Sequence, residues 1–253
     1  MRRLVPALLA LALAATACGS EQPAAEQTEA KTLMVFAAAS LTESFGALGK
    51  QFEAKNPGVT VKFSFEGSSA LVQKLIQGAK ADVFASADQA NMDKATQGEV
   101  IDGQPSVFAT NRLAIAVGKG NPKGVKGLAD LAKDGATVVV CAPQVPCGAA
   151  AKKVQQASGV TLKPASEEQD VKSVLAKVQS GDADAGLVYV TDATSAAAKV
   201  DKVDFPESAG AVNSYPIAVV KDALQAALAK QFTDFVLGAE GKQELAKVGF
   251  GTP

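Results

Sequence analysis

The sequence predicts an α/β protein, and three observations support this class. Apolar runs with the length of strands alternate with helical patterns along most of the chain. Two successive strand-like runs end at a serine that begins a helical pattern, at Ser40 and at Ser68. Aromatic residues make up only 5% of the chain, which suits tightly packed layers. In a parallel sheet both serines would lie at the carboxyl edge, where open α/β sheets bind ligands.

The first of these units begins with the apolar run at residues 33–36. Small residues follow as far as Ser40, and apolar residues then recur at helical spacing, at Leu41, Phe45, Leu48 and Phe52. Ser40 and Glu43 fit a capping box, which would place the serine hydroxyl beside the free backbone N–H groups of a helix start. Such a position can bind an anion, although an ordinary N-cap is the simpler alternative.

The second unit repeats the pattern and strengthens the binding interpretation. Residues 59–65 alternate as a strand, residues 66–67 turn the chain, and Ser68 and Ser69 begin the next helix. Either serine could serve the same site. A third strand is expected at residues 81–86, and Ser86 and Asp88 after it are interpreted as cap and hinge residues.

The rest of the chain continues the alternation. Strands are expected at residues 113–117, 137–141, 185–190 and 212–220, and helices from Ala149 and over residues 167–179, 222–237 and 240–248. Loops are expected at residues 118–127 and 142–148. These elements fit either one doubly wound sheet or two α/β lobes joined by two crossovers.

The amino terminus has the features of an export signal. Arg2 and Arg3 precede an apolar run over residues 4–15, which is too short to span a bilayer. The following Thr16-Ala17-Cys18-Gly19 resembles a bacterial lipobox, so residues 1–17 are expected to be cleaved and Cys18 to carry lipid. A plain secretory signal is the alternative. Residues 18–30 lack large apolar side chains, so they are expected to form a flexible tether with a reach of about 20 Å.

Charge and composition limit the partners of the mature chain. Residues 1–17 carry two arginines and no acidic residue, so their removal changes the formal net charge from −1 to −3 and leaves Arg112 as the last arginine. Without a basic run the protein is not expected to bind nucleic acid, and any anion it binds must be small. Scarce aromatic residues also argue against ligands held by ring stacking.

Several catalytic chemistries lack their residues. The chain contains no histidine, which removes the usual hydrolase triads and the commonest metal ligand. It contains neither a Ser-x-x-Lys motif nor a P-loop, and Cys141 and Cys147 have no second Cys or His pair with which to bind zinc. We therefore expect a binding protein; an anchored enzyme or adhesion module of similar fold is the alternative from another class.

Five segments resemble those of periplasmic molybdate-binding proteins from bacterial ABC importers. They occur in order and span residues 33 to 250. The segments are Phe36-Ala37-Ala38-Ala39-Ser40-Leu41-Thr42, Ala81-Asp82-Val83-Phe84-Ala85-Ser86-Ala87-Asp88-Gln89, Val145-Pro146-Cys147-Gly148, Gly186-Leu187-Val188-Tyr189 and Tyr215-Pro216-Ile217-Ala218-Val219-Val220. The resemblance implies a two-lobed type II solute-binding fold, with residues 31–110 and 214–253 in one lobe and residues 111–213 in the other.

The resemblance also implies a ligand and its binding residues. The family holds its oxyanion by two serine hydroxyls with their N–H groups, two further backbone N–H groups and one tyrosine hydroxyl. These roles correspond here to Ser40 and Ser68, to the backbones of Cys147 and Val171, and to Tyr189. Cys147 departs from the family, which usually has a small residue such as alanine there; a backbone role tolerates this change.

The function implied is capture of molybdate, and of tungstate, for delivery to the permease of an ABC importer in the membrane. The protein would act as a monomer, with no cofactor and with no protein atom bound directly to the metal. Sulfate, phosphate or an organic acid is the alternative ligand. An organic acid would favour an arginine fork, for which Arg112 is the one candidate.

Cys141 and Cys147 are expected to form a disulfide. The expected exported compartment is oxidising, Cys18 is expected to carry lipid, and the two thiols lie across a short loop that contains Pro143 and Pro146. Two free buried thiols are the alternative, which would require Cα atoms more than about 7 Å apart.

Overall fold

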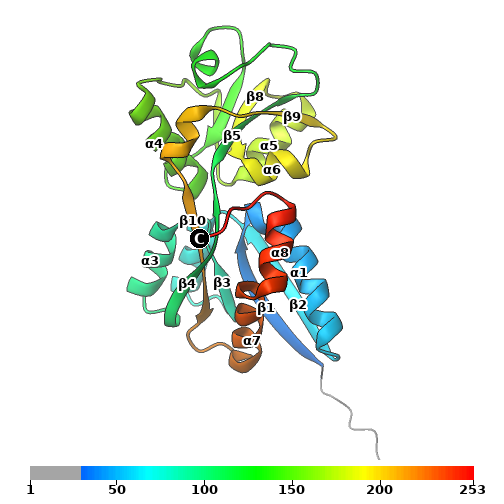
Figure 1. Ribbon diagram of the computed structural model, residues 1–253. Coiled ribbons are helices and arrows are strands. Elements are labelled where there is room, and N and C mark those ends of the chain that lie inside the picture. Colours follow the sequence, from blue (N-terminus) through cyan, green and yellow to red (C-terminus); the bar gives the residue numbers. More distant parts are fainter. Residues whose placement is uncertain (1–29) are drawn as a thin grey trace, which may run out of the picture.

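A computed structural model describes residues 30–253, so the expected signal peptide, the tether up to residue 29 and the lipid site at Cys18 lie outside the described residues. The described chain forms two five-stranded sheets, one above the other in Figure 1, each flanked by helices. We call each sheet with its helices a lobe. The α/β class and the two-lobed arrangement are thereby confirmed, and the single doubly wound sheet is excluded. Within residues 30–253, every helix is too short or too polar to cross a bilayer.

The first sheet has the order β2-β1-β3-β10-β4. Its strands are β1 (Lys31–Ala38), β2 (Val59–Glu66), β3 (Val83–Ala85), β4 (Ile101–Asn111) and β10 (Asn213–Val220). Strand β1 runs parallel to β2 and β3, whereas β10 is antiparallel to β3 and β4. The carboxyl ends of β1 and β2 therefore lie at one edge of the sheet, as the sequence predicts for the two serine turns.

Alternation along β1 explains how helices cover both faces of this sheet. Leu33, Val35 and Ala37 face one core, together with residues of α1 (Thr42–Lys55) and α7 (Ala226–Leu237), while Phe36 faces the other, with residues of α2 (Ser68–Ile76) and α3 (Gln89–Gln97). Helix α8 (Ala239–Lys247) packs on α1 and α7. The sheet is thus buried on both faces, and its serine-bearing edge points toward the second lobe (Figure 1).

The second sheet has the order β7-β6-β8-β5-β9. It contains β5 (Leu113–Gly118), β6 (Val138–Cys141), β7 (Ser166–Glu168), β8 (Ala185–Tyr189) and β9 (Val200–Val203), with helices α4 (Pro146–Ser158), α5 (Val171–Ser180) and α6 (Val190–Ser195). Three short 3₁₀ turns, η1 (Ala39–Leu41), η2 (Leu128–Ala132) and η3 (Pro206–Gly210), complete the described elements.

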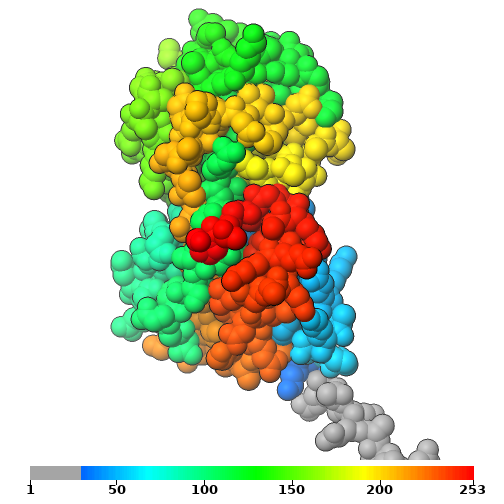
Figure 2. Space-filling model, viewed as in Figure 1, coloured from blue at the N-terminus to red at the C-terminus, as the bar shows by residue number. Residues whose placement is uncertain are grey.

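The chain crosses between the sheets twice, at Arg112 and over residues 204–212, and Figure 2 shows the narrow waist. Asn111 and Asn213 pair with each other at the end of the first sheet, although the sequence prediction placed both in the second lobe. A third segment joins the crossovers at this waist, because Gly251 exchanges two backbone hydrogen bonds with Thr110, of 2.8 and 2.9 Å.

Several predicted element boundaries were wrong for local reasons. The helix expected from residue 167 begins at Val171, because residues 166–168 pair with β6 as a strand that lacks apolar alternation. The helix expected from Ala149 begins at Pro146, whose fixed φ suits the first helical position. Helix α7 begins at Ala226 and not at residue 222. Strands β4 and β9 and helix α6 were not predicted.

Candidate functional site

A small cavity lies between the two lobes, and all five residues expected from the sequence line it. The lining consists of Ala38, Ala39, Ser40, Gly67, Ser68, Ala87, Val145, Pro146, Cys147, Asp170, Val171 and Tyr189. The centre of a water-sized group can occupy about 10 Å³ of this cavity. The cavity therefore suits one compact group and is too small for a sugar or a peptide. The structure therefore brings together side chains from both sheets around a single small space.

Helix starts from both lobes supply the lining. Ser68 and Val171 are the first residues of α2 and α5, and Cys147 is the second residue of α4. Backbone N–H groups at the first positions of a helix have no acceptor within that helix, and the helix dipole makes this end positive. Three such starts at one cavity form an environment that favours a negative charge, although the lining contains no lysine or arginine.

Ser40 contributes in a different way from the capping box expected from the sequence. It lies in η1, and α1 begins at Thr42 with Leu41 as an N-cap that has no side-chain bond. The Ser40 Oγ instead lies 3.0 Å from the Tyr215 hydroxyl, on β10. The capping box was wrong because the 3₁₀ turn delays the helix start and directs the serine into the cavity.

Tyr215 was not predicted as a site residue. Its ring is fully buried and packs edgewise on Phe108, Phe250 and Tyr189, at centroid distances of 6.2, 5.2 and 5.9 Å. One signal was available in the sequence: a tyrosine that is buried in a strand usually needs a polar partner for its hydroxyl.

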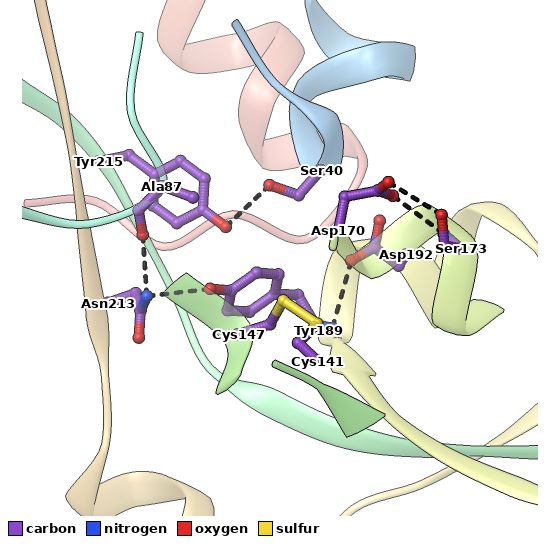
Figure 3. Close-up of a disulfide and its surroundings, with 10 residues drawn as sticks. All are labelled: Ser40, Ala87, Cys141, Cys147, Asp170, Ser173, Tyr189, Asp192, Asn213 and Tyr215. Atoms are coloured by element: carbon purple, nitrogen blue, oxygen red, sulfur yellow. Dashed lines mark hydrogen bonds between the residues drawn. A yellow bond between two sulfur atoms is a disulfide. The ribbon is translucent and has the colours of Figure 1, made fainter. Parts of the chain in front are cut away.

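The backbone of a single residue, Ala87, connects the other two hydroxyls of the site, those of Ser68 and Tyr189. Its N–H donates to the Ser68 Oγ at 3.0 Å. Its carbonyl accepts from the Asn213 side-chain amide at 2.8 Å, and the same amide nitrogen donates to the Tyr189 hydroxyl at 2.9 Å. Figure 3 shows Asn213 between Ala87 and Tyr189. Asn213 was also missed, because an asparagine beside a strand carries no sequence signal of this role.

Both tyrosines keep their protons. Burial raises the pKa of Tyr189 and the pKa of Tyr215 well above the ordinary range, and nearby acidic groups raise the pKa of Tyr189 further. A neutral phenol retains its O–H and can donate it to an anion.

The carboxylates nearest to the cavity are engaged elsewhere. Asp170 caps α5 and accepts from the backbone N–H and the hydroxyl of Ser173, at 2.9 and 2.8 Å (Figure 3). Asp88 caps α3 and accepts from the Asn91 N–H at 3.0 Å, as its predicted capping role requires. Among the described residues, those that line the cavity include no lysine or arginine.

Arg112 lies away from the cavity. Its guanidinium donates to the Ser208 hydroxyl at 3.3 Å and is 3.9 Å from an Asp204 oxygen, so it braces the crossover. An organic acid therefore lacks the arginine fork that would have favoured it. Within residues 30–253 there is also no group of three or more His, Cys, Asp or Glu side chains that could hold a metal ion.

A charged network at the rim of the cavity joins the lobes. The Lys172 ammonium on α5 lies 2.7 Å from Glu43 on α1 and 3.0 Å from the Oδ1 of Asp192 on α6. Asp192 Oδ1 lies close to the ammonium without hydrogen-bond geometry, so this contact is mainly electrostatic. The other Asp192 oxygen accepts from the Tyr189 N–H at 3.2 Å. The network thus holds the lobes together and positions the backbone of Tyr189.

The pKa values of this network have opposing causes. Burial raises the pKa of Asp192 to about 6, although Lys172 opposes the shift. Burial alone would lower the pKa of Lys172, but Asp192 and Glu43 outweigh it and the net shift is upward. Both groups are therefore charged at neutral pH.

Asp192 is expected to make stability depend on pH. Because the folded chain holds the Asp192 proton more tightly than the unfolded chain, the contribution of Asp192 to the free energy of unfolding should decrease as the pH rises from 3.8 to about 6. The contribution is on the order of 3 kcal/mol or less. In urea titrations across this range, the free energy of unfolding of the wild type minus that of Asp192→Asn should decrease as the pH rises, whereas Asp182→Asn, at an exposed aspartate, should follow the wild type. Equal pH dependence in all three proteins would contradict this assignment.

Cys141 and Cys147 form a disulfide, with Cα atoms 5.7 Å apart. The bond closes the loop between β6 and α4, immediately before the Cys147 N–H at the cavity. Gly148 allows this tight arrangement, because a Cβ at that position would lie 1.9 Å from the Ala142 carbonyl oxygen. Loop and helix start therefore form one rigid unit.

The lobes are in close contact at Gly67, the residue before α2. A Cβ on this residue would lie 2.3 Å from the backbone oxygen of Gln169, which precedes α5 in the other lobe. Gly67 has φ −60° and ψ 135°, which any residue adopts, so contact with the other lobe and not backbone conformation requires glycine here. The lobes are therefore closed over the cavity.

Comparison with known proteins agrees with this architecture. Residues 33–251 match the family model described as bacterial extracellular solute-binding protein. The molybdate-binding protein ModA of Mycobacterium tuberculosis is 50% identical over 254 residues, which cover 99% of this chain and 97% of the relative. That of Escherichia coli is 33% identical over 228 residues, covering 86% and 88%.

Among solved structures, the periplasmic molybdate-binding protein of Azotobacter vinelandii superposes with a TM-score of 0.77 at 23% identity, over 87% of this chain and 99% of that one. This likeness confirms the type II solute-binding fold. With the family match and the sequence relatives, it also confirms the resemblance that the five segments indicated. The chain belongs to the family of bacterial extracellular solute-binding proteins.

Proposed function

We propose that this protein captures molybdate, and also tungstate, in the cavity between its lobes. One observation carries the proposal: hydroxyls and helix-start N–H groups from both lobes line a single small cavity that contains no cationic side chain. Three hydroxyls would donate to the anion, those of Ser40, Ser68 and Tyr189. Four backbone N–H groups would also donate, those of Ser40, Ser68, Cys147 and Val171. Such a donor set suits a compact, fully deprotonated oxyanion.

The energies are sufficient for tight binding. Each hydrogen bond to a charged group contributes about 1.5–3 kcal/mol. A handful of such bonds exceeds the roughly 8 kcal/mol of micromolar binding and leaves a surplus to offset closure of the lobes. Hydrogen phosphate is disfavoured, because its own O–H would face hydroxyl and N–H donors, and the one carboxylate in the lining, Asp170, already accepts two hydrogen bonds from Ser173.

Calorimetric titration of the mature protein with molybdate, tungstate, sulfate and phosphate tests the proposal. We expect molybdate and tungstate to bind one per chain, far more tightly than sulfate or phosphate. Equal affinity for sulfate and molybdate would show instead a general oxyanion-binding protein.

The same proposal includes the cellular role. The protein would be exported, anchored through lipid on Cys18, and would deliver its ligand as a monomer to the permease of an ABC importer, without catalysing a reaction. The closed lobes support this role, since ligand release then needs only rotation about the crossovers near Arg112 and residues 204–212.

Reduction of the disulfide is expected to weaken molybdate binding by about tenfold. The bond closes a short loop, so its loss should cost at most about 2 kcal/mol of folding stability. Its loss should also let the Cys147 N–H move away from the anion. Titrations and melting curves with and without reductant should show a larger relative change in the affinity for molybdate than in the melting temperature. Unchanged affinity after verified reduction would exclude this role for the bond.

A further inference from the structure

Asn213 faces two groups whose chemistry fixes the direction of its hydrogen bonds. Its side chain lies 2.8 Å from the Ala87 carbonyl oxygen and 2.9 Å from the Tyr189 hydroxyl oxygen. A backbone carbonyl only accepts, so the amide nitrogen, and not the amide oxygen, must occupy this position. The second hydrogen of that nitrogen then points at Tyr189.

This orientation determines what the Tyr189 hydroxyl can do. Because the amide nitrogen can only donate, the phenol oxygen must accept from it. The Tyr189 proton must therefore point away from Asn213, toward either the neighbouring Tyr215 hydroxyl or the cavity, which Tyr189 lines. Asn213 is 8% exposed and Tyr189 is 1% exposed, so water cannot readily replace either partner.

The backbone of Ala87 also acts on a second hydroxyl, that of Ser68. The Ala87 N–H donates to the Ser68 Oγ at 3.0 Å, so this oxygen also accepts, and its proton is also free. Ala87 itself lines the cavity between the two hydroxyls.

We propose that Asn213 is a positioning residue for anion binding: held by the Ala87 carbonyl, it makes the Tyr189 hydroxyl a donor to the bound oxyanion. The residue acts through Tyr189 and does not line the cavity itself. This inference rests on the proposed function, because it specifies how the cavity presents only protons to its ligand.

A double-mutant cycle on the full mature protein tests the inference, with molybdate affinity as the readout. We expect Asn213→Ala to weaken binding about tenfold in the wild type but by less than twofold in a Tyr189→Phe background, where no hydroxyl remains to be oriented. An equal loss in both backgrounds, or no loss in the wild type, would overturn the role.

Asn111 provides the matched control. It is a buried asparagine that pairs with Asn213 in the sheet and donates to Thr191 in the second lobe at 2.9 Å. Any loss of affinity from Asn111→Ala should be the same with and without the Tyr189 hydroxyl. Dependence of both asparagines on Tyr189 would indicate a general loosening of the waist and would overturn the specific role of Asn213.

A spectroscopic measurement gives an independent readout. The chain contains no tryptophan and only two tyrosines, so Tyr215→Phe leaves Tyr189 as the one phenol. A phenol that accepts a hydrogen bond absorbs at shorter wavelength. With molybdate saturating, adding Asn213→Ala to Tyr215→Phe should therefore shift the near-ultraviolet band to longer wavelength, and an unchanged band would overturn the proposed bond. If the wild type fails to bind molybdate, the proposed function fails; if it binds and the cycle is additive, only this inference fails.

Discussion

Replacement of Gly67 by alanine is expected to weaken molybdate binding about 100-fold while leaving the fold intact. The added Cβ would lie 2.3 Å from the Gln169 oxygen, a backbone atom of the other lobe that cannot move by changing a rotamer. The backbone angles of Gly67 accept alanine, so each lobe should fold normally. Overpacking of this kind costs about 1–3 kcal/mol, and here the cost arises only when the lobes close.

Gly46→Ala is the matched control for this experiment. A Cβ at Gly46, within α1, would meet no atom within 4 Å, so this variant should bind like the wild type. Calorimetry gives the affinities, and circular dichroism and melting temperature report on the fold. Wild-type affinity in Gly67→Ala would mean that the bound state is more open than the arrangement described above.

Combined replacement of Ser40 and Ser68 by alanine should have a comparable or larger effect. Removing one partner of a buried charge costs about 1–3 kcal/mol, so each single variant should lose about five- to 150-fold in affinity. The two serines have different neighbours, Tyr215 and the Ala87 N–H, so their losses should be nearly additive.

The adjacent Ser69 serves as the control for this pair. Ser69 does not line the cavity, so Ser69→Ala should bind like the wild type. Loss of the Ser68 hydroxyl leaves the Ala87 N–H without its acceptor, and loss of the Ser40 hydroxyl leaves the buried Tyr215 hydroxyl without its partner. A modest decrease in melting temperature should therefore accompany each variant. If Ser40→Ala and Ser68→Ala both bound molybdate with wild-type affinity, while their circular dichroism was unchanged, the site assignment would be contradicted.

The sequence predicted those parts of the site that depend on local pattern. Strand-to-helix turns at Ser40 and Ser68 are visible because apolar periodicity changes from two residues to nearly four at a polar residue. The pairing of Cys141 with Cys147 follows from chain proximity and compartment. The resemblance of the five segments then added the expected roles of Cys147, Val171 and Tyr189, which no pattern could supply and which all line the cavity.

The partners of those residues depend on tertiary structure and could not be predicted in this way. Asn213 reaches Ala87 across 126 positions of sequence, and Tyr215 reaches Ser40 across 175. Periodicity describes one element at a time and says nothing of which strand lies beside which. The short strand over residues 166–168 was missed for a related reason: its pairing with β6, and not its own composition, makes it a strand.

Because Gly251 pairs with Thr110, the two ends of the described chain lie at different distances from the hinge between the lobes. The carboxyl end is held at the waist, beside the crossovers (Figure 1), whereas β1 begins at Lys31, at the opposite end of the sheet from the cavity. Eight residues of strand separate that beginning from the serine edge, about 26 Å. A fluorophore attached at the carboxyl end would therefore sense rotation of the lobes, and immobilisation through the amino end would leave that rotation free. The protein has the geometry of a single-chain optical sensor for its anion.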